Sequence, residues 1–336
     1  MKILFIGGTG RISMAISRRL IEKGEDLYLL NRGNRSSEIS GVSEIQADIH
    51  NEDDVSRKLN GLTFDAVADF IAYNPADLER DYRLFRGKTR QFIYISSASA
   101  YQKPLQNNLI NESTPLINPY WDYSRNKIAG ENFLMEKYRT ENFPITIVRP
   151  SHTYDERGVP VGLHGKNGSW QVLKRMIDGK RIIIPGDGTA FWTMTHNSDF
   201  AVGFIGLLGN PHAIGQAVQI MSTESMTWNQ IYQTIADDLN VKLNSVHISS
   251  EFLGLAGLQY DFRGQLLGDK ANSVNFDISK LQSLVPEFLP KISMTAGIGK
   301  SVAYVLDHPE CQIADPDFDK WCDHVLTVRD QAVASL

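Results

Sequence analysis

Three side chains in two segments of the chain have the types and the spacing that proton transfer coupled to hydride transfer requires. Tyr123 and Lys127 are four residues apart, so on a helix they lie on one face. Ser97 precedes Tyr123 by 26 residues, in the segment Tyr94–Tyr101. A free tyrosine titrates near pH 10, and a nearby ammonium together with an oxidised nicotinamide favours its phenolate. We therefore predict that Tyr123 exchanges a proton with substrate, that Ser97 donates to the substrate oxygen, and that Lys127 holds the nicotinamide ribose.

A glycine-rich turn behind the first expected strand indicates the dinucleotide site that this chemistry needs. The chain reads Gly7-x-x-Gly10-x-x-Ser13 directly after the apolar run Lys2–Ile6. Gly7 allows a tight turn, Gly10 lets a pyrophosphate approach the backbone, and the first N–H groups of the following helix receive its charge. Serine at the third small position is a tolerable departure. A tyrosine–lysine pair alone is common on exposed helices, and a glycine turn can lack a ligand, but the combination with Ser97 favours a dinucleotide-dependent enzyme.

The residues behind the second expected strand bear on the choice between NADP(H) and NAD(H). An NAD site usually has an acid there that holds the ribose hydroxyls, whereas Leu30–Ser36 contains none. Instead Asn31 is followed by Arg32 and Arg35, which favours a 2′-phosphate and hence NADP(H). The alternative is NAD(H), with both arginines solvated in a loop. Asp48, after the next strand, is placed either to accept from the adenine amino group or to cap a helix.

The order of apolar and amphipathic stretches predicts the scaffold that positions these residues. Strands are expected at Lys2–Ile6, Leu27–Leu30, Glu44–Ala47, Ala66–Ile71, Gln91–Ile95 and Thr146–Val148, with helical stretches between them. This alternation predicts an α/β fold, a Rossmann-type doubly wound parallel sheet with a smaller C-terminal α/β substrate lobe. We expect a dinucleotide-binding domain over residues 1–150 and a substrate-binding lobe over 151–336, with elements around 196–222 rejoining the first domain.

Composition excludes several other classes of protein. The net charge is −5 and no block of Lys and Arg occurs, which argues against a nucleic-acid partner. Cys311 and Cys322 are the only cysteines, and no Cys/His spacing is typical of a metal site, so we expect no metal and a reducing, cytoplasmic location. The apolar run Ile3–Ile6 is far too short to span a membrane.

Taken together, these motifs resemble those of the extended short-chain dehydrogenase/reductases, the NAD(P)-dependent epimerase/dehydratase family, over most of the chain. Val148–Tyr154 looks like the family's Arg-Pro…Tyr segment, and Ile184–Gly188 and Thr195–Asp199 look like its Gly-Asp-Gly and His-Val-Asp-Asp motifs. The resemblance implies Ser97, Tyr123 and Lys127 as the catalytic triad, and a homodimer formed through helices that include the one bearing Tyr123. The cofactor-binding residues expected from the motifs and the resemblance are Gly7, Thr9, Gly10, Arg11, Ile12, Asn31, Arg32, Arg35, Asp48, Ile49, Phe70, Ile71, Ala72, Tyr123, Lys127 and Pro150.

Departures from the family pattern bear on the substrate. Where relatives acting on nucleotide-diphosphate sugars carry a diphosphate-clamping Arg, this chain has Trp192, which either stacks on a sugar ring or packs in the lobe core. Arg263 could compensate for the missing Arg. The acid pair of sugar 4,6-dehydratases is absent after Ser97, which disfavours that reaction. His152 is expected either to bind substrate and exchange a proton or to be structural. Ser99, His152 and Trp192 are thus the predicted substrate residues.

The sequence therefore predicts an NAD(P)-dependent oxidoreductase or epimerase that acts on a secondary alcohol or ketone of a sugar-like substrate. One alternative is a nucleotide-sugar 4-epimerase, which would keep its cofactor tightly bound and recognise a nucleoside diphosphate. Another is a relative that senses a cofactor or binds RNA without turnover. The intact Ser97, Tyr123 and Lys127 set argues against a sensor, and the net charge argues against RNA.

Overall fold

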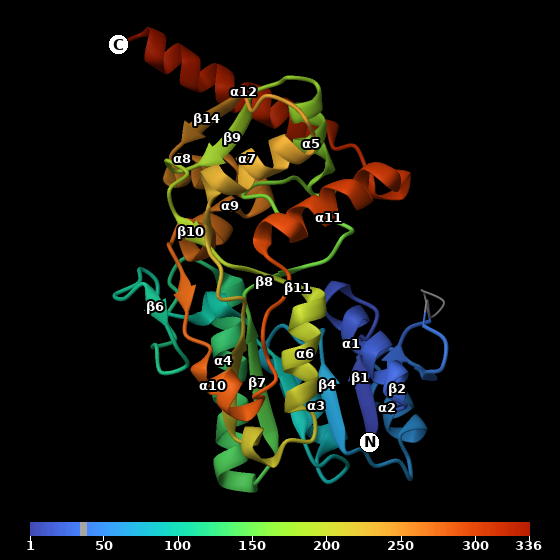
Figure 1. The fold of residues 1–336 in the computed structure, drawn as a ribbon. Coiled ribbons are helices and arrows are strands. Elements are labelled where there is room, and N and C mark those ends of the chain that lie inside the picture. The colour runs from blue at the N-terminus through green and yellow to red at the C-terminus, as the bar shows by residue number, and fades with distance from the viewer. Residues whose placement is uncertain (34–38) are drawn as a thin grey trace.

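A seven-stranded sheet in which every strand pair is parallel forms the base of the molecule (Figure 1). The computed structural model describes residues 1–33 and 39–336, so the predicted cofactor residue Arg35 lies outside the described residues. The strand order is β3-β2-β1-β4-β5-β7-β12. The strands are β1 (Lys2–Ile6), β2 (Asp26–Asn31), β3 (Ser43–Gln46), β4 (Ala66–Asp69), β5 (Phe92–Ile95), β7 (Ile145–Pro150) and β12 (Gln216–Ile220). This order reverses between β1 and β4, as in a doubly wound dinucleotide fold, and the predicted fold class is confirmed.

Alternate residues of β1 point into two separate cores, which explains why the strand is apolar throughout. Ile3 and Phe5 pack with α1 (Arg11–Glu22) and α6 (Asn197–Leu207) on one face of the sheet. Leu4 and Ile6 pack into the other core. That second face is covered by α2 (Glu52–Lys58), α3 (Pro75–Phe85) and α4 (Asp122–Glu141). A parallel sheet buried on both faces reads as continuous hydrophobic runs.

The chain returns to the sheet after it has begun the C-terminal lobe. The segment 196–222 supplies α6 and the edge strand β12, whose Gln216 and Val218 lie beside Thr146 and Val148 of β7. A later return, by α10 (Ser279–Leu284), packs against β12 and α6. Nearby, β15 (Asn275–Phe276) pairs with β6 (Leu109–Ile110). No motif or composition shift in the sequence predicts this second return.

The upper lobe in Figure 1 is built from short strand pairs and helices above the carboxyl ends of the sheet strands. Its strand pairs are β8 (His152–Tyr154) with β11 (Met194–His196), β9 (Ile182–Pro185) with β14 (Ser245–Ile248), and β10 (Phe191–Trp192) with β13 (Met226–Thr227). Its helices are α5 (Trp170–Ile177), α7 (Trp228–Asp238), α8 (Ser250–Ala256), α9 (Phe262–Gln265), α11 (Met294–Asp307) and α12 (Pro316–Ala334), with a π-helix, η4, at Leu266–Lys270. None of the helices in the described part of the chain is long and apolar enough to cross a membrane.

A buried ion pair fixes α4, the helix that carries Tyr123 and Lys127, against the sheet. Arg149 of β7 donates to both carboxylate oxygens of Glu131 of α4, at 3.0 Å from Nε and 2.6 Å from Nη2. Ser96, at the end of β5, donates to the same carboxylate at 2.5 Å. These contacts therefore join β7 to α4 and to the end of β5, the two elements from which the predicted catalytic groups come.

Replacing Glu131 with glutamine should destabilise the fold, because Arg149 is left buried without its counter-charge. Breaking one side of a buried ion pair typically costs about 3–5 kcal/mol, and urea unfolding monitored by circular dichroism would measure the loss. Glu136→Gln, on the exposed face of the same helix, is the control and should change the free energy of unfolding by less than about 0.5 kcal/mol. Equal stability of the two variants would contradict the prediction.

Candidate active site

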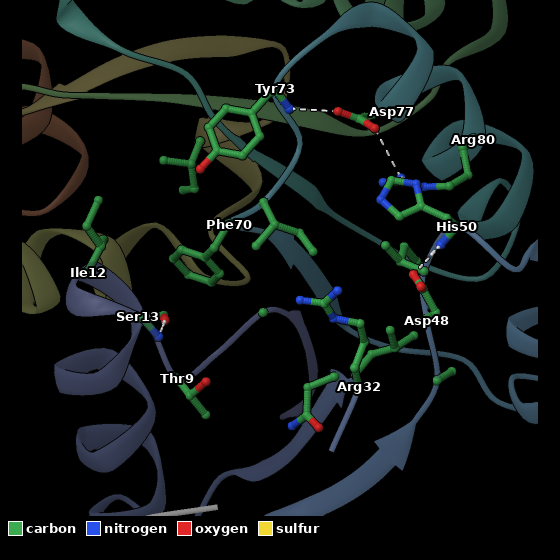
Figure 2. Close-up of a pocket in the computed structure, with 18 of the residues that line it drawn as sticks. Thr9, Ile12, Ser13, Arg32, Asp48, His50, Phe70, Tyr73, Asp77 and Arg80 are labelled. Atoms are coloured by element: carbon green, nitrogen blue, oxygen red, sulfur yellow. Dashed lines mark hydrogen bonds and ion pairs between the residues drawn. The ribbon is translucent and has the colours of Figure 1, made fainter. Parts of the chain in front are cut away.

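A cleft of about 860 Å³ opens at the carboxyl ends of β1, β2 and β4, where the strand order reverses (Figure 2). Ligands of open α/β sheets bind at this point. We call this cleft the dinucleotide cleft. Eleven of the predicted cofactor residues line it, namely Gly7, Thr9, Gly10, Arg11, Ile12, Asn31, Arg32, Asp48, Ile49, Phe70 and Ile71.

The glycine turn forms the floor of this cleft and leaves backbone donors for an anion. Gly7 has φ +90°, a left-handed conformation that favours glycine. Ser13, at the third small position, accepts a hydrogen bond from the Gly10 N–H at 2.9 Å, so the serine caps the turn rather than merely being tolerated. The N–H groups of Arg11 and Ile12 in the first turn of α1 have no intrahelical acceptor. They are therefore available to a pyrophosphate, as in other helix N-terminal phosphate sites.

Arg32 and Asp48 stand at the far side of the dinucleotide cleft, where Figure 2 shows the Arg32 guanidinium pointing into the space. The Arg32 side chain forms no ion pair with any residue that the structure describes. The Asp48 carboxylate accepts from the His50 N–H at 3.0 Å. The cap of α2 is instead Asn51, whose side chain accepts from the Asp54 N–H at 3.2 Å. Of the two roles expected for Asp48, the helix cap is therefore wrong.

Lys127 is buried in α4 and is not among the described residues that line the dinucleotide cleft or the cavity under the substrate lobe. Its ammonium donates to the carbonyl oxygens of Ala72 at 2.7 Å and Ile95 at 2.8 Å. It also lies 5.6 Å from the ring centre of Tyr123. Two of its three N–H groups are thus used, and one remains for a ligand. Burial lowers the pKa of Lys127 to about 8. Ala72, predicted to line the cofactor, is buried and meets the site through this carbonyl rather than through its side chain.

The Tyr123 phenol is neutral at pH 7 in the described structure. Burial raises the pKa of Tyr123 to about 12, although a hydrogen bond with Ser97 acts in the opposite direction. The positive charge of an oxidised nicotinamide beside the phenol would favour the phenolate.

A chain of three serine hydroxyls sets the direction in which Ser97 can donate. Ser124, buried in α4, donates to the Ser99 hydroxyl at 2.8 Å, and the Ser99 and Ser97 hydroxyls are 2.9 Å apart. The Ser99 N–H also donates to the Ser97 oxygen at 3.1 Å. Because Ser99 accepts from Ser124, it is free to donate to Ser97, whose two lone pairs are then used. The Ser97 proton is left to point toward Tyr123 or a substrate oxygen.

Replacing Ser124 with alanine should weaken catalysis without weakening substrate binding. Loss of the first donor lets the Ser99 hydroxyl reverse, so that Ser97 loses the partner that directs its proton outward. We expect kcat to fall about tenfold with KM unchanged, a loss near 1.4 kcal/mol that is typical of one hydrogen bond. Ser301→Ala, which removes another buried helical serine that donates to backbone carbonyls, is the control for stability. A rise in KM with kcat intact would contradict the positioning role.

A second cavity, of about 290 Å³, lies under the substrate lobe, and we call it the substrate pocket. Ser97, Tyr123 and all three predicted substrate residues line it together. Pro150, predicted to line the cofactor, also faces this pocket and not the dinucleotide cleft. Its complete lining is Ser97, Ala98, Ser99, Lys103, Trp121, Tyr123, Pro150, Ser151, His152, His164, Trp192, Thr193, Gln265, Asp269, Lys270, Val274 and Phe276.

Trp192 and His152 form an aromatic wall of the substrate pocket. The Trp192 ring stacks on Trp228 with centroids 5.5 Å apart, and its edge meets His152 at 6.3 Å. Trp192 is only 3% exposed, and its indole N–H is buried without a hydrogen-bond partner among the described residues. Burial lowers the pKa of His152 to about 3, so at neutral pH the ring is uncharged and can exchange hydrogen bonds but is not a cationic acid.

Lys103, Asp269 and Lys270 also line this pocket and were missed by reasoning from the sequence. Lys103 lies in a loop that contains no recognisable motif. Asp269 and Lys270 are the last two residues of the π-helix, a conformation that no local sequence pattern predicts. His164 also lines this pocket. Only the path of the chain through the lobe brings these residues to Ser97.

The fold and the cleft at the point where the strand order reverses define a class, the Rossmann-type dinucleotide-binding proteins. Residues 3–220 match the model of the NAD dependent epimerase/dehydratase family, and the chain belongs to that family. The predicted family, and with it the prediction of an NAD-dependent enzyme of the short-chain dehydrogenase type, is confirmed.

The relatives and structures that this chain resembles include both reductases and epimerases. It is 23% identical over 289 residues to 2'-dehydrokanamycin reductase from Streptomyces kanamyceticus, covering 86% of this chain and 80% of that protein. It is 25% identical over 238 residues to an uncharacterized UDP-glucose epimerase from Bacillus subtilis, covering 70% and 67%. Its fold is similar to that of UDP-glucuronic acid 4-epimerase from Bacillus cereus in complex with NAD, with a TM-score of 0.71, 20% identity and coverage of 94% and 99%.

Proposed function

We propose that Tyr123 transfers a proton to or from a secondary hydroxyl of a sugar-like substrate held in the substrate pocket, with Ser97 hydrogen-bonded to the same oxygen. The observation that carries the proposal is that the hydroxyl groups of Ser97 and Tyr123 meet in one pocket, with the Lys127 ammonium 5.6 Å from the centre of the Tyr123 ring. Two hydrogen-bond donors to one substrate oxygen stabilise the negative charge that develops on it during hydride transfer.

The dinucleotide cleft has the donors and the shape for a nicotinamide dinucleotide. Arg11 and Ile12 would bind the pyrophosphate through their backbone N–H groups, and the remaining N–H of Lys127 would bind the nicotinamide ribose. The bound group would supply the hydride acceptor or donor. Its positive charge in the oxidised state would lower the pKa of Tyr123 from the raised value of the free protein.

NADP(H) is the cofactor that we propose, with NAD(H) as the alternative. The support is the Arg32 guanidinium, which points into the dinucleotide cleft free of any ion pair in the described chain, and the lack of an acid at the end of β2. A guanidinium gives paired hydrogen bonds to a phosphate that ribose hydroxyls cannot match.

The substrate that we propose is a sugar without a nucleotide. No arginine lines the substrate pocket within the described chain, and the aromatic wall of Trp192 and His152 occupies the region where a diphosphate clamp would be needed. Arg263, the candidate to replace that clamp, is exposed and does not line the pocket. The alternative, a nucleotide-sugar 4-epimerase, is favoured by the names of relatives such as the UDP-glucose epimerase from Bacillus subtilis.

A screen of binding followed by turnover tests this proposal. The protein, loaded with NADP⁺ or NAD⁺, is heated with UDP, dTDP and a panel of free sugars, and shifts in Tm are recorded. Free sugars that raise Tm are then assayed for formation of reduced cofactor at 340 nm. We expect stabilisation by sugars and none by UDP or dTDP. Stabilisation by a nucleoside diphosphate would support the 4-epimerase instead, and failure to bind either dinucleotide would contradict both.

The homodimer and the cytoplasmic location also remain proposals. None of the exposed large hydrophobic side chains in the described chain belongs to α3 or α4. The exposed face of α4 carries Arg125, Asn126 and Asn132, so a dimer through this helix would be polar. Light scattering coupled to size-exclusion chromatography would give the mass in solution.

A further inference from the structure

Three charged side chains line the substrate pocket and have no part in the proposed proton transfer. Lys103 lies in the loop after the 3₁₀ turn Ala98–Ala100, and Asp269 and Lys270 are the last residues of η4. Leaving the histidines aside, they are the only charged groups among the pocket's described lining residues.

Lys103 is an ammonium group without a hydrogen-bond partner in the described chain. It is only 3% exposed, and burial lowers its pKa, while Asp269 acts on it from beyond ion-pair distance. A buried charge is costly unless it is paired and hydrogen-bonded. A hydrogen-bonding anion could reach the Lys103 ammonium from the substrate pocket, which Lys103 lines.

Lys270 is 7% exposed and keeps donors free in the same pocket. Its ammonium donates once, to the Gly162 carbonyl at 3.0 Å, which leaves two N–H groups. Its backbone carbonyl accepts from the Trp228 indole at 2.9 Å, so its position is fixed. π-helical turns are rare and are frequent at functional sites.

The π-helix is tied to the loop that carries the catalytic serine. Asn118 donates both to the Gly268 carbonyl of η4 and to the Ser99 carbonyl, each at 2.7 Å. Gly268 and Gly264 lie against Trp121, where an added Cβ would come within 2.9 Å of the Trp121 Cβ and 2.2 Å of its indole ring, respectively. A ligand group bound by Lys270 would therefore be held at a fixed position relative to Ser97.

The charges of the substrate pocket do not balance within the protein. Two ammonium groups face one carboxylate, and the remaining titratable groups, His152 and His164, are neutral because burial lowers their pKa to about 3 and about 4. Tyr123 is neutral as well. The pocket thus holds one positive charge in excess, and a ligand with one negative charge would neutralise it.

We propose that the substrate carries an anionic group, a carboxylate or a phosphate monoester, and that Lys103 and Lys270 bind it while the reacting hydroxyl faces Ser97 and Tyr123. This inference rests on the proposed function, since it concerns the same pocket. It narrows the substrate from a sugar to an acidic or phosphorylated sugar.

Calorimetric titration of the NADP⁺-loaded protein tests the proposal. The probes are D-glucose, D-glucuronate and D-glucose 6-phosphate, which differ in the anionic group, together with acetate and inorganic phosphate, which carry that group without a sugar. Loading with NADP⁺ fills the phosphate sites of the dinucleotide cleft. We expect an anionic probe to bind at least tenfold more tightly than glucose. Preference for glucuronate and acetate assigns a carboxylate, and preference for the two phosphates assigns a phosphate monoester.

Variants that remove a positive charge and a variant that removes a negative charge should change the anion affinity in opposite directions. Lys103→Met and Lys270→Met should each weaken anion binding about 30-fold, whereas Asp269→Asn should tighten the binding of phosphate or acetate, because it removes the opposing charge. Lys280→Met is the matched control, since Lys280 is also partly buried and donates to a carbonyl, that of Ala217 at 2.8 Å, outside the pocket. Its anion affinity should equal that of the unaltered protein.

Three results would each overturn the proposal. Glucose could bind as tightly as every anion, no anion could show saturable binding up to tens of millimolar, or anion binding could be unchanged in both lysine variants. None of these titrations needs turnover. A protein that binds anions through Lys103 and Lys270 but oxidises no sugar would leave the inference standing and refute the proposed function. Turnover of neutral sugars alone would support the proposed function and refute the inference of an anionic substrate.

Discussion

Replacement of Tyr123 with phenylalanine is expected to lower kcat by about 10³-fold while the dinucleotide still binds. The phenol lines the substrate pocket and is the group that we propose exchanges a proton with the substrate oxygen. General acid–base catalysis by one side chain contributes about 10²–10⁴-fold. Single-turnover measurement of reduced cofactor, with the best substrate from the binding screen, would give the rate.

Two readouts separate this catalytic loss from a structural one. Phenylalanine keeps the ring that packs against Trp121 at a centroid distance of 4.8 Å and Tyr73 at 6.2 Å, so the free energy of unfolding should change little. Fluorescence titration with NADPH should give the unaltered Kd. Residual activity above a tenth of the normal rate would rule out Tyr123 as the proton-transfer group, and Ser97 would then need to be examined.

The second large effect is expected at the adenosine end of the dinucleotide cleft, where Arg32→Glu should reverse the cofactor preference. The present guanidinium favours a 2′-phosphate, and a glutamate there repels that phosphate and accepts from ribose hydroxyls. We expect the Kd for NADPH to rise about 100-fold, a loss near 2.7 kcal/mol, and the Kd for NADH to fall.

Arg32→Gln is the matched control, because it removes the charge without adding an opposite one. Its Kd for NADPH should lie between those of the glutamate variant and the unaltered protein, and its Kd for NADH should stay nearly unchanged. The rise for NADPH should shrink at high salt, since the contact is between charges near solvent. The proposal of NADP(H) would be contradicted if the unaltered protein bound NADH more tightly than NADPH. It would also be contradicted if both variants left the ratio of the two Kd values unchanged.

The local sequence was sufficient for the parts of the fold that depend on neighbouring residues. The run Lys2–Ile6 is apolar at every position, and it is a strand with those bounds because both faces of a parallel sheet are buried. The helix expected directly behind the glycine turn is α1, which begins at Arg11 and ends at Glu22. The glycine turn could be predicted because a left-handed backbone at Gly7 is a property of one residue.

Local pattern was not sufficient where side chains from distant segments act together. The role of Ser13 as acceptor for Gly10 and the chain from Ser124 through Ser99 to Ser97 depend on hydrogen-bond direction, which spacing does not encode. The carbonyl partners of Lys127, those of Ala72 and Ile95, likewise come from other segments and follow only from the folded chain.

By itself, the sequence determined that the chain folds around a Rossmann-type parallel sheet, because periodicity and turn chemistry are local, and it singled out the hydroxyls of Ser97 and Tyr123 as candidates for proton transfer. The tertiary structure alone decided that these hydroxyls share a pocket with Lys103 and Lys270, which lie more than 160 residues apart in the chain. Substrate recognition depends on which charges the folded chain buries together and leaves unbalanced, and burial is a property of the whole fold rather than of any segment.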